Sequence, residues 1–154
     1  MPLYREGWVA PLANDGPVAL PLGDWLQAPT QAVALANTDQ PTELRTHLGR
    51  LKLIVLDFPK FTDGRAYSQA RLLRGKLGYR GELRASGQVL RDQLPFLLRC
   101  GFDSFETDQP GFGPALARAR GLFSVVYQGA EDGRAPASLL RLRRLDATAR
   151  LAAE

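Results

Sequence analysis

Continuous apolar runs alternate with amphipathic stretches along most of the chain. The clearest run is LKLIVLDF at residues 51–58, and its unbroken apolar character is typical of a strand buried on both faces. Shorter runs of the same kind predict further strands at residues 32–36, 81–86, 102–107 and 122–128. The pattern therefore predicts a sheet rather than an all-helical fold.

Stretches with apolar residues at helical spacing lie between and beyond these runs. They predict helices at about residues 39–48, 64–77, 88–100, 110–120 and 135–153. Gly78 is expected to end the second of these helices. In the third, Pro95 lacks the N–H that a helix interior needs, so we expect a kink or a break there.

The regular alternation of strands and helices indicates an α/β fold. Parallel strands need long crossovers and helices supply them, so we predict one domain with about five mostly parallel strands. An open sheet is favoured over a half-barrel, because so few strand–helix units cannot close the usual barrel. We expect residues 31–154 to form this domain and the proline-rich residues 1–30 to form an irregular arm packed on it.

Composition places the chain among ordinary soluble globular proteins. Its 154 residues are 45% hydrophobic and 23% charged, which suits a single folded core. No apolar run approaches the ~20 residues of a membrane span, and the N-terminal residues lack the regions of a signal peptide. We therefore expect a cytoplasmic protein without membrane contact.

The chain has one cysteine, Cys100, and one histidine, His47. These numbers exclude an internal disulfide, a CxxC redox pair and a cysteine-based zinc or iron–sulfur site within one chain. Neither the glycine-rich fingerprint of dinucleotide-binding folds nor a phosphate-binding P-loop occurs. We predict no metal site and no bound cofactor, and we interpret Cys100 as a buried small hydrophobe.

Positive charge is concentrated in the middle of the chain. The formal net charge is +4, but residues 60–99 alone carry nine Lys and Arg against three acids, a balance of +6. Such a field can attract a small anion, an acidic protein surface or nucleic acid. The cations are not interleaved with aromatic residues and no reader motif is present, which argues against nucleic acid.

The densest chemistry follows the strand at residues 51–58, in the stretch DFPKFTDGRAYSQARLLR. Ligands of parallel α/β folds bind where strands end at their carboxyl edge and helices begin. Lys60 and Arg65, together with N–H groups at the helix start, predict an oxyanion cradle. Gly64 is expected to let the backbone turn tightly into the helix.

Further residues complete the predicted site. Asp57, Lys60 and Asp63 are the candidates for a catalytic group, with either aspartate as a base. Ser68 and Arg84 are expected to join in anion binding. A purely structural interpretation of the loop stays open, in which Asp63 caps the helix and the arginines face solvent.

Two further strand ends carry polar residues, at residues 84–88 and 106–113. Arg91 and Asp92 follow the first of them, and as neighbours on a helix they point apart. We therefore expect Asp92 to form a structural salt bridge with an arginine rather than to share a ligand with Arg91.

Residues 58–106 carry a resemblance to a known bacterial family. The matching blocks are FPxFxDGRxYSxARLLR, GYxGELRAxGxVLRDQ and RCGFDxFE, and VALPLGDW at residues 18–25 also fits. The segment resembles a domain-of-unknown-function family that is described as an oxidoreductase of sulfite reduction. Its genes lie beside those of the sulfite/nitrite reductase haemoprotein and of sulfate assimilation. Pro95 departs from the family pattern, which has an aromatic or apolar helix former there.

The resemblance implies a role in sulfur metabolism. Sulfite reduction requires a redox centre, and the sequence has no motif for flavin, haem, iron–sulfur cluster or nicotinamide. We therefore expect an accessory component of assimilatory sulfite reduction that acts with sulfite reductase or its electron donor. The alternative is a small oxyanion- or phosphate-binding α/β enzyme or binding protein that uses residues 57–71. Whether the chain is itself an enzyme stays open.

Overall fold

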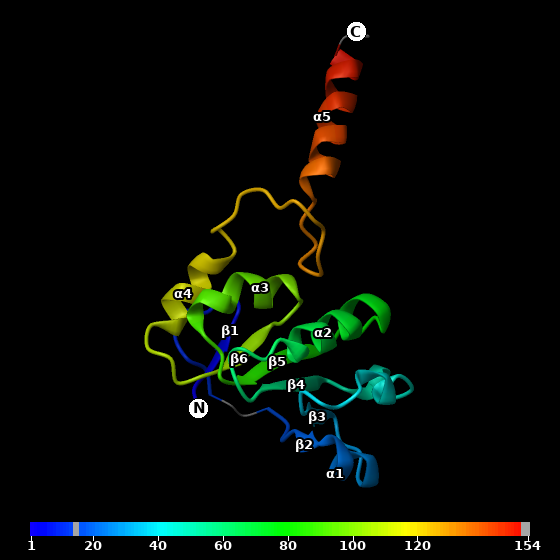
Figure 1. The fold of residues 1–154 in the computed structure, drawn as a ribbon, viewed down its shortest axis with the longest axis vertical. Helices are drawn as coiled ribbons and strands as arrows, with labels where there is room; N and C mark the ends of the chain where they lie inside the picture. The colour runs from blue at the N-terminus through cyan, green and yellow to red at the C-terminus, as the bar shows by residue number, and fades with distance from the viewer. Residues whose placement is uncertain (14–15, 152–154) are drawn as a thin grey trace.

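The molecule is built on one open β-sheet, shown in Figure 1. The computed structural model describes residues 1–13 and 16–151, and side chains up to residue 145. Within these residues the strands, in their order across the sheet, are β1 (Leu3–Arg5), β6 (Ser104–Glu106), β5 (Glu82–Gly87), β4 (Leu53–Phe58), β3 (Ala32–Leu35) and β2 (Leu20–Pro21). Strands β2 to β6 are parallel, and β1 pairs antiparallel with β6. The predicted α/β class and the open sheet are thus confirmed.

Helical segments connect the strands. Those in the described part of the chain are α1 (Leu22–Gln27), η1 (Pro41–Leu44), η2 (Leu48–Arg50), α2 (Arg65–Arg71), η3 (Leu72–Lys76), η4 (Arg91–Gln93), α3 (Leu94–Arg99), α4 (Phe112–Ala119) and α5 (Ala137–Leu151). η1, η2 and η4 are 3₁₀ turns, and η3 is a π-helical turn that continues α2. None of the described helices combines the length and the apolar character needed to cross a membrane.

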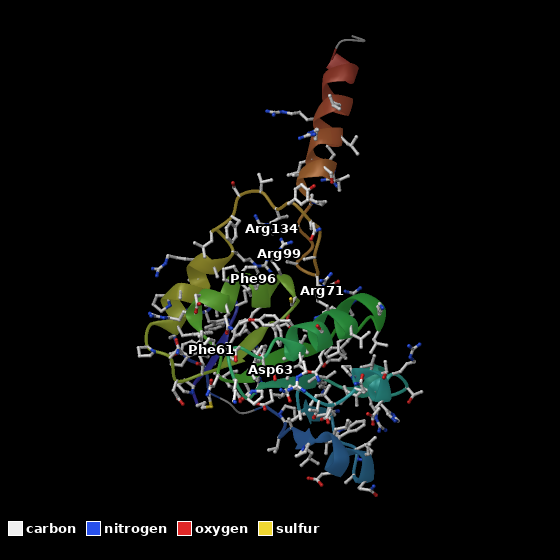
Figure 2. All side chains as sticks on the ribbon, in the orientation of Figure 1. Phe61, Asp63, Arg71, Phe96, Arg99 and Arg134 are labelled. Carbon is white, nitrogen blue, oxygen red and sulfur yellow. The ribbon has the colours of Figure 1, made fainter. Side chains whose placement is uncertain are left out.

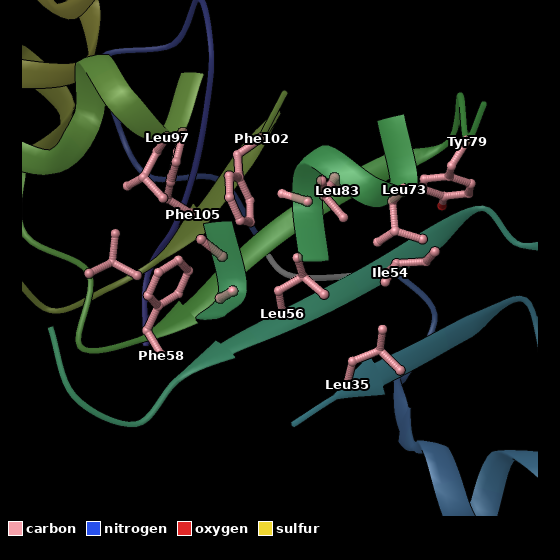
Figure 3. Close-up of a cluster of buried hydrophobic side chains, with 14 of the residues drawn as sticks. Leu35, Ile54, Leu56, Phe58, Leu73, Tyr79, Leu83, Leu97, Phe102 and Phe105 are labelled. Carbon is pink, nitrogen blue, oxygen red and sulfur yellow. The ribbon is translucent and has the colours of Figure 1, made fainter. Parts of the chain in front are cut away.

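The helices cover one face of the sheet. From β2 to β6, each strand pairs on the same side of the strand that precedes it in the chain. Parallel strands in this order are joined by right-handed connections, which therefore all pass over the same face of the sheet. Ile54, Leu56 and Phe58 of β4 point to this face and are buried. They pack with Leu73 of η3 and Leu97 of α3 in one hydrophobic cluster (Figure 3). The core therefore lies between the sheet and the helix layer.

The other face of the sheet is largely polar. Along β5, alternate residues point away from the helix layer, and these are Glu82, Arg84 and Ser86. The N-terminal arm lies on this face, where Leu12, Gly16 and Pro17 line a depression together with Glu82 and Arg84. Residues 1–30, expected to be irregular, thus supply β1, β2 and α1.

Two predicted elements are wrong. Residues 122–128 form no strand, and their pairing within the described chain is an isolated bridge between Val126 and Pro136. The edge of the sheet next to β6 is instead occupied by β1, so this apolar run has no strand to pair with. Residues 39–48, expected to be one helix, contain η1 and the start of η2.

Of the kink or break expected at Pro95, the structure shows a break rather than a kink. The segment at residues 88–100 divides into η4 and α3, and α3 begins at Leu94, so Pro95 occupies its first turn. An N–H at that position has no partner inside a helix, and its loss costs nothing. The C-terminal helix is confirmed as α5, which extends away from the body in Figure 1, while residues 152–153 of the prediction lie outside the described residues.

Candidate functional site

The predicted cradle in the loop after β4 contains an internal ion pair. The Arg65 guanidinium donates to the Asp63 carboxylate, with Nη2 2.7 Å from Oδ2 and Nε 3.0 Å from Oδ1. The backbone N–H of Arg65 donates to the same Oδ1 at 3.1 Å, so Asp63 also pairs with the first N–H of α2, although the residue at the N-cap is Gly64. Asp63 therefore pairs with both the Arg65 guanidinium and the first N–H of the predicted cradle. Figure 2 shows Asp63 beside α2.

Two aspartates at this end of the strand have opposite electrostatics. Hydrogen bonds from the side chain and backbone of Arg65 lower the pKa of Asp63 to about 2, and Asn37 adds a bond of 2.6 Å. Burial instead raises the pKa of Asp57, which lies near the end of β4. Asp57 is thus the better proton acceptor of the two, because a carboxylate with a raised pKa holds a proton more readily.

The other predicted residues lie on different parts of the surface. Lys60 is exposed in the loop after β4. Ser68 is exposed on α2 and lines a depression of ≈ 460 Å³ between α2 and α3, together with Arg71 and Phe96 (Figure 2). Asp57 lies on the face of the sheet away from the helices, since its neighbours along β4 point into the core. The predicted set is therefore divided between both sides of the sheet.

Glycine is required at a different strand end from the one expected. Gly64 has φ −84° and ψ 0°, which other residues adopt, and a Cβ there would meet nothing within 4 Å. The expected glycine-specific turn is therefore wrong. Gly87 at the end of β5 has φ +94°, and a Cβ there would lie 2.5 Å from the Phe58 carbonyl oxygen and 3.0 Å from Asp57 Oδ1.

Arg84 is held inside the molecule on the polar face of the sheet. Its side chain is 5% exposed and forms ion pairs with Glu82 at 2.8 Å and with Glu106 at 2.9 Å. The hydroxyl groups of Ser104 and Ser86 donate to these carboxylates at 2.6 and 3.1 Å. Burial would raise the pKa of Glu82, but the bonds from Ser104 and Arg84 outweigh it and lower the pKa. Two carboxylates of the chain thus neutralise Arg84.

A second arginine of the matching sequence blocks is also structural. The Arg74 side chain is 9% exposed, and its Nη2 lies 2.5 Å from Asp103 Oδ2. Its guanidinium also donates to the carbonyl oxygens of Gly101, Tyr79 and Gly81, each at 2.9 Å. Arg74 therefore ties η3 to the segments before β5 and β6.

A cleft of ≈ 520 Å³ opens between the segments that follow β5 and β6, and its charged and amide side chains are Arg91, Asp92, Gln109 and Arg118. We call it the β5–β6 cleft. Asp92 forms no ion pair with an arginine among the described residues, so its expected structural salt bridge is wrong. Sequence reasoning singled out Arg91 but missed Gln109 and Arg118, because only the fold brings α4 beside η4.

Metal-binding and thiol chemistry find little support in the described part of the chain. Within it, no group of three or more histidine, cysteine, aspartate or glutamate side chains could hold a metal ion. Cys100 is half-buried, and burial raises the pKa of its thiol. Since the thiolate is the reactive form, a thiol with a raised pKa is a poor nucleophile at neutral pH.

Comparison with known proteins identifies the family. The model of the family described as a bacterial protein of unknown function, DUF934, matches residues 32–138. Searches among curated proteins and among solved structures found no match. The matched span is more than half of the chain and runs from β3 to the beginning of α5. The chain therefore belongs to the DUF934 family.

Proposed function

We propose that the chain is an accessory protein of assimilatory sulfite reduction that docks on the sulfite reductase haemoprotein. Two observations support this role: the sequence resemblance of residues 58–106, and an exposed apolar surface near the C-terminus. The C-terminal segment, defined as residues 121–145, exposes large apolar side chains beside arginines. Docking is the role that such a surface supports best.

The exposed apolar side chains of the C-terminal segment carry the proposal. The following are between 39% and 87% exposed: Leu122, Phe123, Val125, Tyr127, Leu139, Leu140, Leu142 and Leu145. Removing apolar surface from water stabilises an interface by roughly 25 cal/mol per Å². A complex in which a partner protein covers this segment is therefore stabilised by the burial of its apolar side chains.

The C-terminal segment is anchored to the body near its middle. The Glu131 N–H donates to the Arg99 carbonyl oxygen at 3.0 Å, and the Arg99 guanidinium contacts Asp132 at 3.3 Å. Figure 2 shows Arg99 and Arg134 in one region of the molecule with Phe96 of α3, whose side chain is 64% exposed. Part of the apolar surface is thus presented by a fixed scaffold rather than by a loose tail.

The charge of the C-terminal segment fits an acidic partner. Its residues include four arginines and two acids, a balance of +2. Arg141 and Arg143 are exposed on α5. Opposite surface charge speeds encounter and sets orientation, which redox partners require. We take an acidic surface of the reductase haemoprotein as the docking site, rather than one on its electron donor, because the resemblance places the family's genes beside that of the haemoprotein.

The second candidate, a protein that binds an oxyanion with residues 57–71, has less support. Asp63 neutralises Arg65 and accepts a hydrogen bond from the first N–H of α2, so the loop keeps Lys60 but not Arg65 for an anion. The raised pKa of Asp57 is the observation in favour of this candidate, because it suits a general base.

Binding of the full chain to purified sulfite reductase haemoprotein tests the proposal. We expect a complex that weakens as salt rises, because salt screens exposed charges over about 8 Å at physiological strength. Phe123→Ser with Tyr127→Ser, and separately Arg141→Glu with Arg143→Glu, should each lower the affinity by about tenfold or more. Surface plasmon resonance at two salt concentrations provides the measurement.

The matched control lies in the predicted cradle. Lys60→Glu with Arg65→Glu makes the same change of charge there and should leave the affinity within about twofold. The proposal is contradicted if the haemoprotein does not bind, even when the electron donor does. It is contradicted as well if the cradle variant abolishes binding while the variants of the C-terminal segment do not.

A further inference from the structure

The β5–β6 cleft lies at the edge of the sheet where parallel α/β proteins bind ligands. One wall is η4, which follows β5, and the other is α4, which follows β6. Because β5 and β6 are neighbouring parallel strands, their carboxyl ends place the two walls side by side. The C-terminal segment proposed for docking does not include the cleft residues, so the cleft is available for a separate function.

Arg91 reaches across the cleft to the start of α4. Gly111 precedes α4 with φ +69°, a left-handed conformation that glycine adopts without strain. A Cβ at Gly111 would lie 3.2 Å from Arg91 Nη1, so the guanidinium packs directly on the glycine. The missing side chain thus makes room for the arginine.

Arg118 approaches the same space from α4. Gly111, Ala115 and Arg118 follow one another at intervals of four and three residues, which places them on one face of the helix, and all line the cleft. Helical side chains slope toward the N-terminus, so Arg118 leans toward the end of α4 that Arg91 contacts. Two guanidinium groups therefore share one cleft.

A buried threonine connects the two walls. Thr107 is 2% exposed, and its hydroxyl donates to the Val89 carbonyl oxygen at 3.1 Å and accepts from the Gln109 N–H at 3.3 Å. On the η4 wall, the Gln93 side chain accepts from the Leu90 N–H at 3.2 Å. These bonds order the backbone on both sides of the cleft, which lowers the entropic cost of binding a ligand there.

The charges of the cleft favour an anion. Among the described residues, Arg91 and Arg118 form no ion pair with a carboxylate, in contrast to Arg65 and Arg84. Asp92 also lines the cleft, but the two arginines outnumber this single carboxylate, so the charge of the cleft stays positive. Like charges in one cleft repel each other, and an anion between them removes that cost.

We propose that the β5–β6 cleft binds a small oxyanion of the sulfite, sulfate or phosphate type through Arg91 and Arg118. A guanidinium presents two parallel N–H groups that match the oxygen atoms of such ions. A second depression of ≈ 390 Å³ shares Leu90 and Gln109 with the cleft, and it gives room for an organic group when the oxyanion is an ester. The recognised chemistry is the same for the free ion and the ester.

Isothermal titration calorimetry of the full chain with sulfite, sulfate and phosphate at low ionic strength tests the site. We expect saturable binding of at least one of these ions, weakened about tenfold or more by Arg91→Gln or Arg118→Gln. Gly111→Ala should weaken it too, because the new Cβ displaces the Arg91 guanidinium. Asp92→Asn should strengthen it, since a negative charge leaves the wall, and no folding defect can imitate such a gain.

Controls distinguish a defined site from a general positive field. Lys76→Gln and Arg80→Gln remove the same charge at exposed positions outside the cleft and should leave the affinity within about twofold. Phenyl phosphate, compared with phosphate, identifies an esterified ligand if it binds more tightly and a free ion if it does not. The proposal is overturned if none of the ions binds saturably, or if the Lys76 and Arg91 variants weaken binding equally.

Discussion

The loop after β4 and the β5–β6 cleft stand at the same edge of the sheet, yet their arginines have different partners. In the loop, Asp63 accepts hydrogen bonds from both the Arg65 guanidinium and the N–H at the start of α2. In the cleft, Arg91 packs on Gly111 and has no carboxylate at ion-pair distance among the described residues. Arginines that look equivalent in the sequence thus differ in what they can offer a ligand.

The position of the nearest acid explains the difference. Asp63 precedes Arg65 by two residues and lies just before α2, where its carboxylate can turn back to the first N–H and meet the guanidinium. Asp92 directly follows Arg91 within η4, and adjacent side chains of a helical turn diverge. Asp63, placed before α2, therefore neutralises Arg65, whereas Asp92, placed next to Arg91 inside the turn, forms no ion pair with it.

The largest expected effect on stability concerns Arg84, which is buried and paired with two carboxylates and is therefore not available to a ligand. Arg84→Met removes the cation between Glu82 and Glu106 and leaves two partly buried carboxylates without it. We expect the free energy of unfolding, measured by urea denaturation near neutral pH, to fall by about 3–5 kcal/mol. Adding Glu82→Gln and Glu106→Gln should recover part of the loss, because these changes remove negative charge that Arg84 had balanced. The recovery is only partial because the Glu82 change also removes the ion pair of Glu82 with Arg5.

Arg91→Met is the matched control from the cleft. Arg91 is exposed and forms no ion pair within the described chain, so the free energy of unfolding should change by less than about 0.5 kcal/mol. If Arg84→Met and Arg91→Met had equal effects on stability, the division between structural and available arginines would be wrong.

A smaller effect on the free energy of unfolding distinguishes Gly87, at the end of β5, from Gly64, in the loop after β4. Gly87→Ala places a Cβ in a left-handed conformation and against the Phe58 carbonyl oxygen, so it should lower the free energy of unfolding by about 2 kcal/mol or more. Gly64→Ala should change it by less than about 0.5 kcal/mol, because reduced chain entropy offsets the poorer preference for alanine at a helix start. Urea denaturation of both variants provides the comparison, and a more harmful Gly64 variant would contradict it.

The smallest expected effect on stability concerns the ion pair between Asp63 and Arg65 in the loop after β4. NMR titration of the Asp63 carboxyl should give a pKa of about 2, and Arg65→Ala should return it toward the ordinary value of 3.8. Because the pKa is lower in the folded state, the pair stabilises the protein fully above about pH 4, and this contribution is lost as pH falls toward 2. An ordinary pKa for Asp63 in the unaltered protein would mean that Arg65 is not neutralised.

Local pattern predicted the middle of the sheet but not its edge. The runs at residues 51–58 and 81–86 became β4 and β5, within two residues at each end, because a strand between two others is apolar along its core face. Residues 122–128 have similar character, yet β1, from the other end of the chain, already pairs with β6. Which segment occupies an edge depends on long-range pairing that a local pattern does not contain.

The chemistry of the strand ends was visible in the sequence, whereas the partners of each side chain were not. The contact between Asp63 and Arg65 depends on side-chain geometry at the start of α2, so spacing alone could not show that it neutralises the predicted cradle. Arg118 lies beside η4 because β5 and β6 are neighbours, and its spacing from Gly111 was the available signal. Arg84 was predicted to bind an anion and has two internal carboxylates as partners.

Following individual arginine side chains during an anion titration tests most directly which of them can meet a ligand. In ¹H–¹⁵N spectra of the Nε–Hε groups, sulfite should shift the signals of Arg91 and Arg118 saturably. The signals of Arg65 and Arg84 should stay unchanged, because their hydrogen bonds are already made within the chain. Saturable shifts of Arg65 with Arg91 and Arg118 unchanged would contradict the account, and so would an equal drift of every exposed arginine.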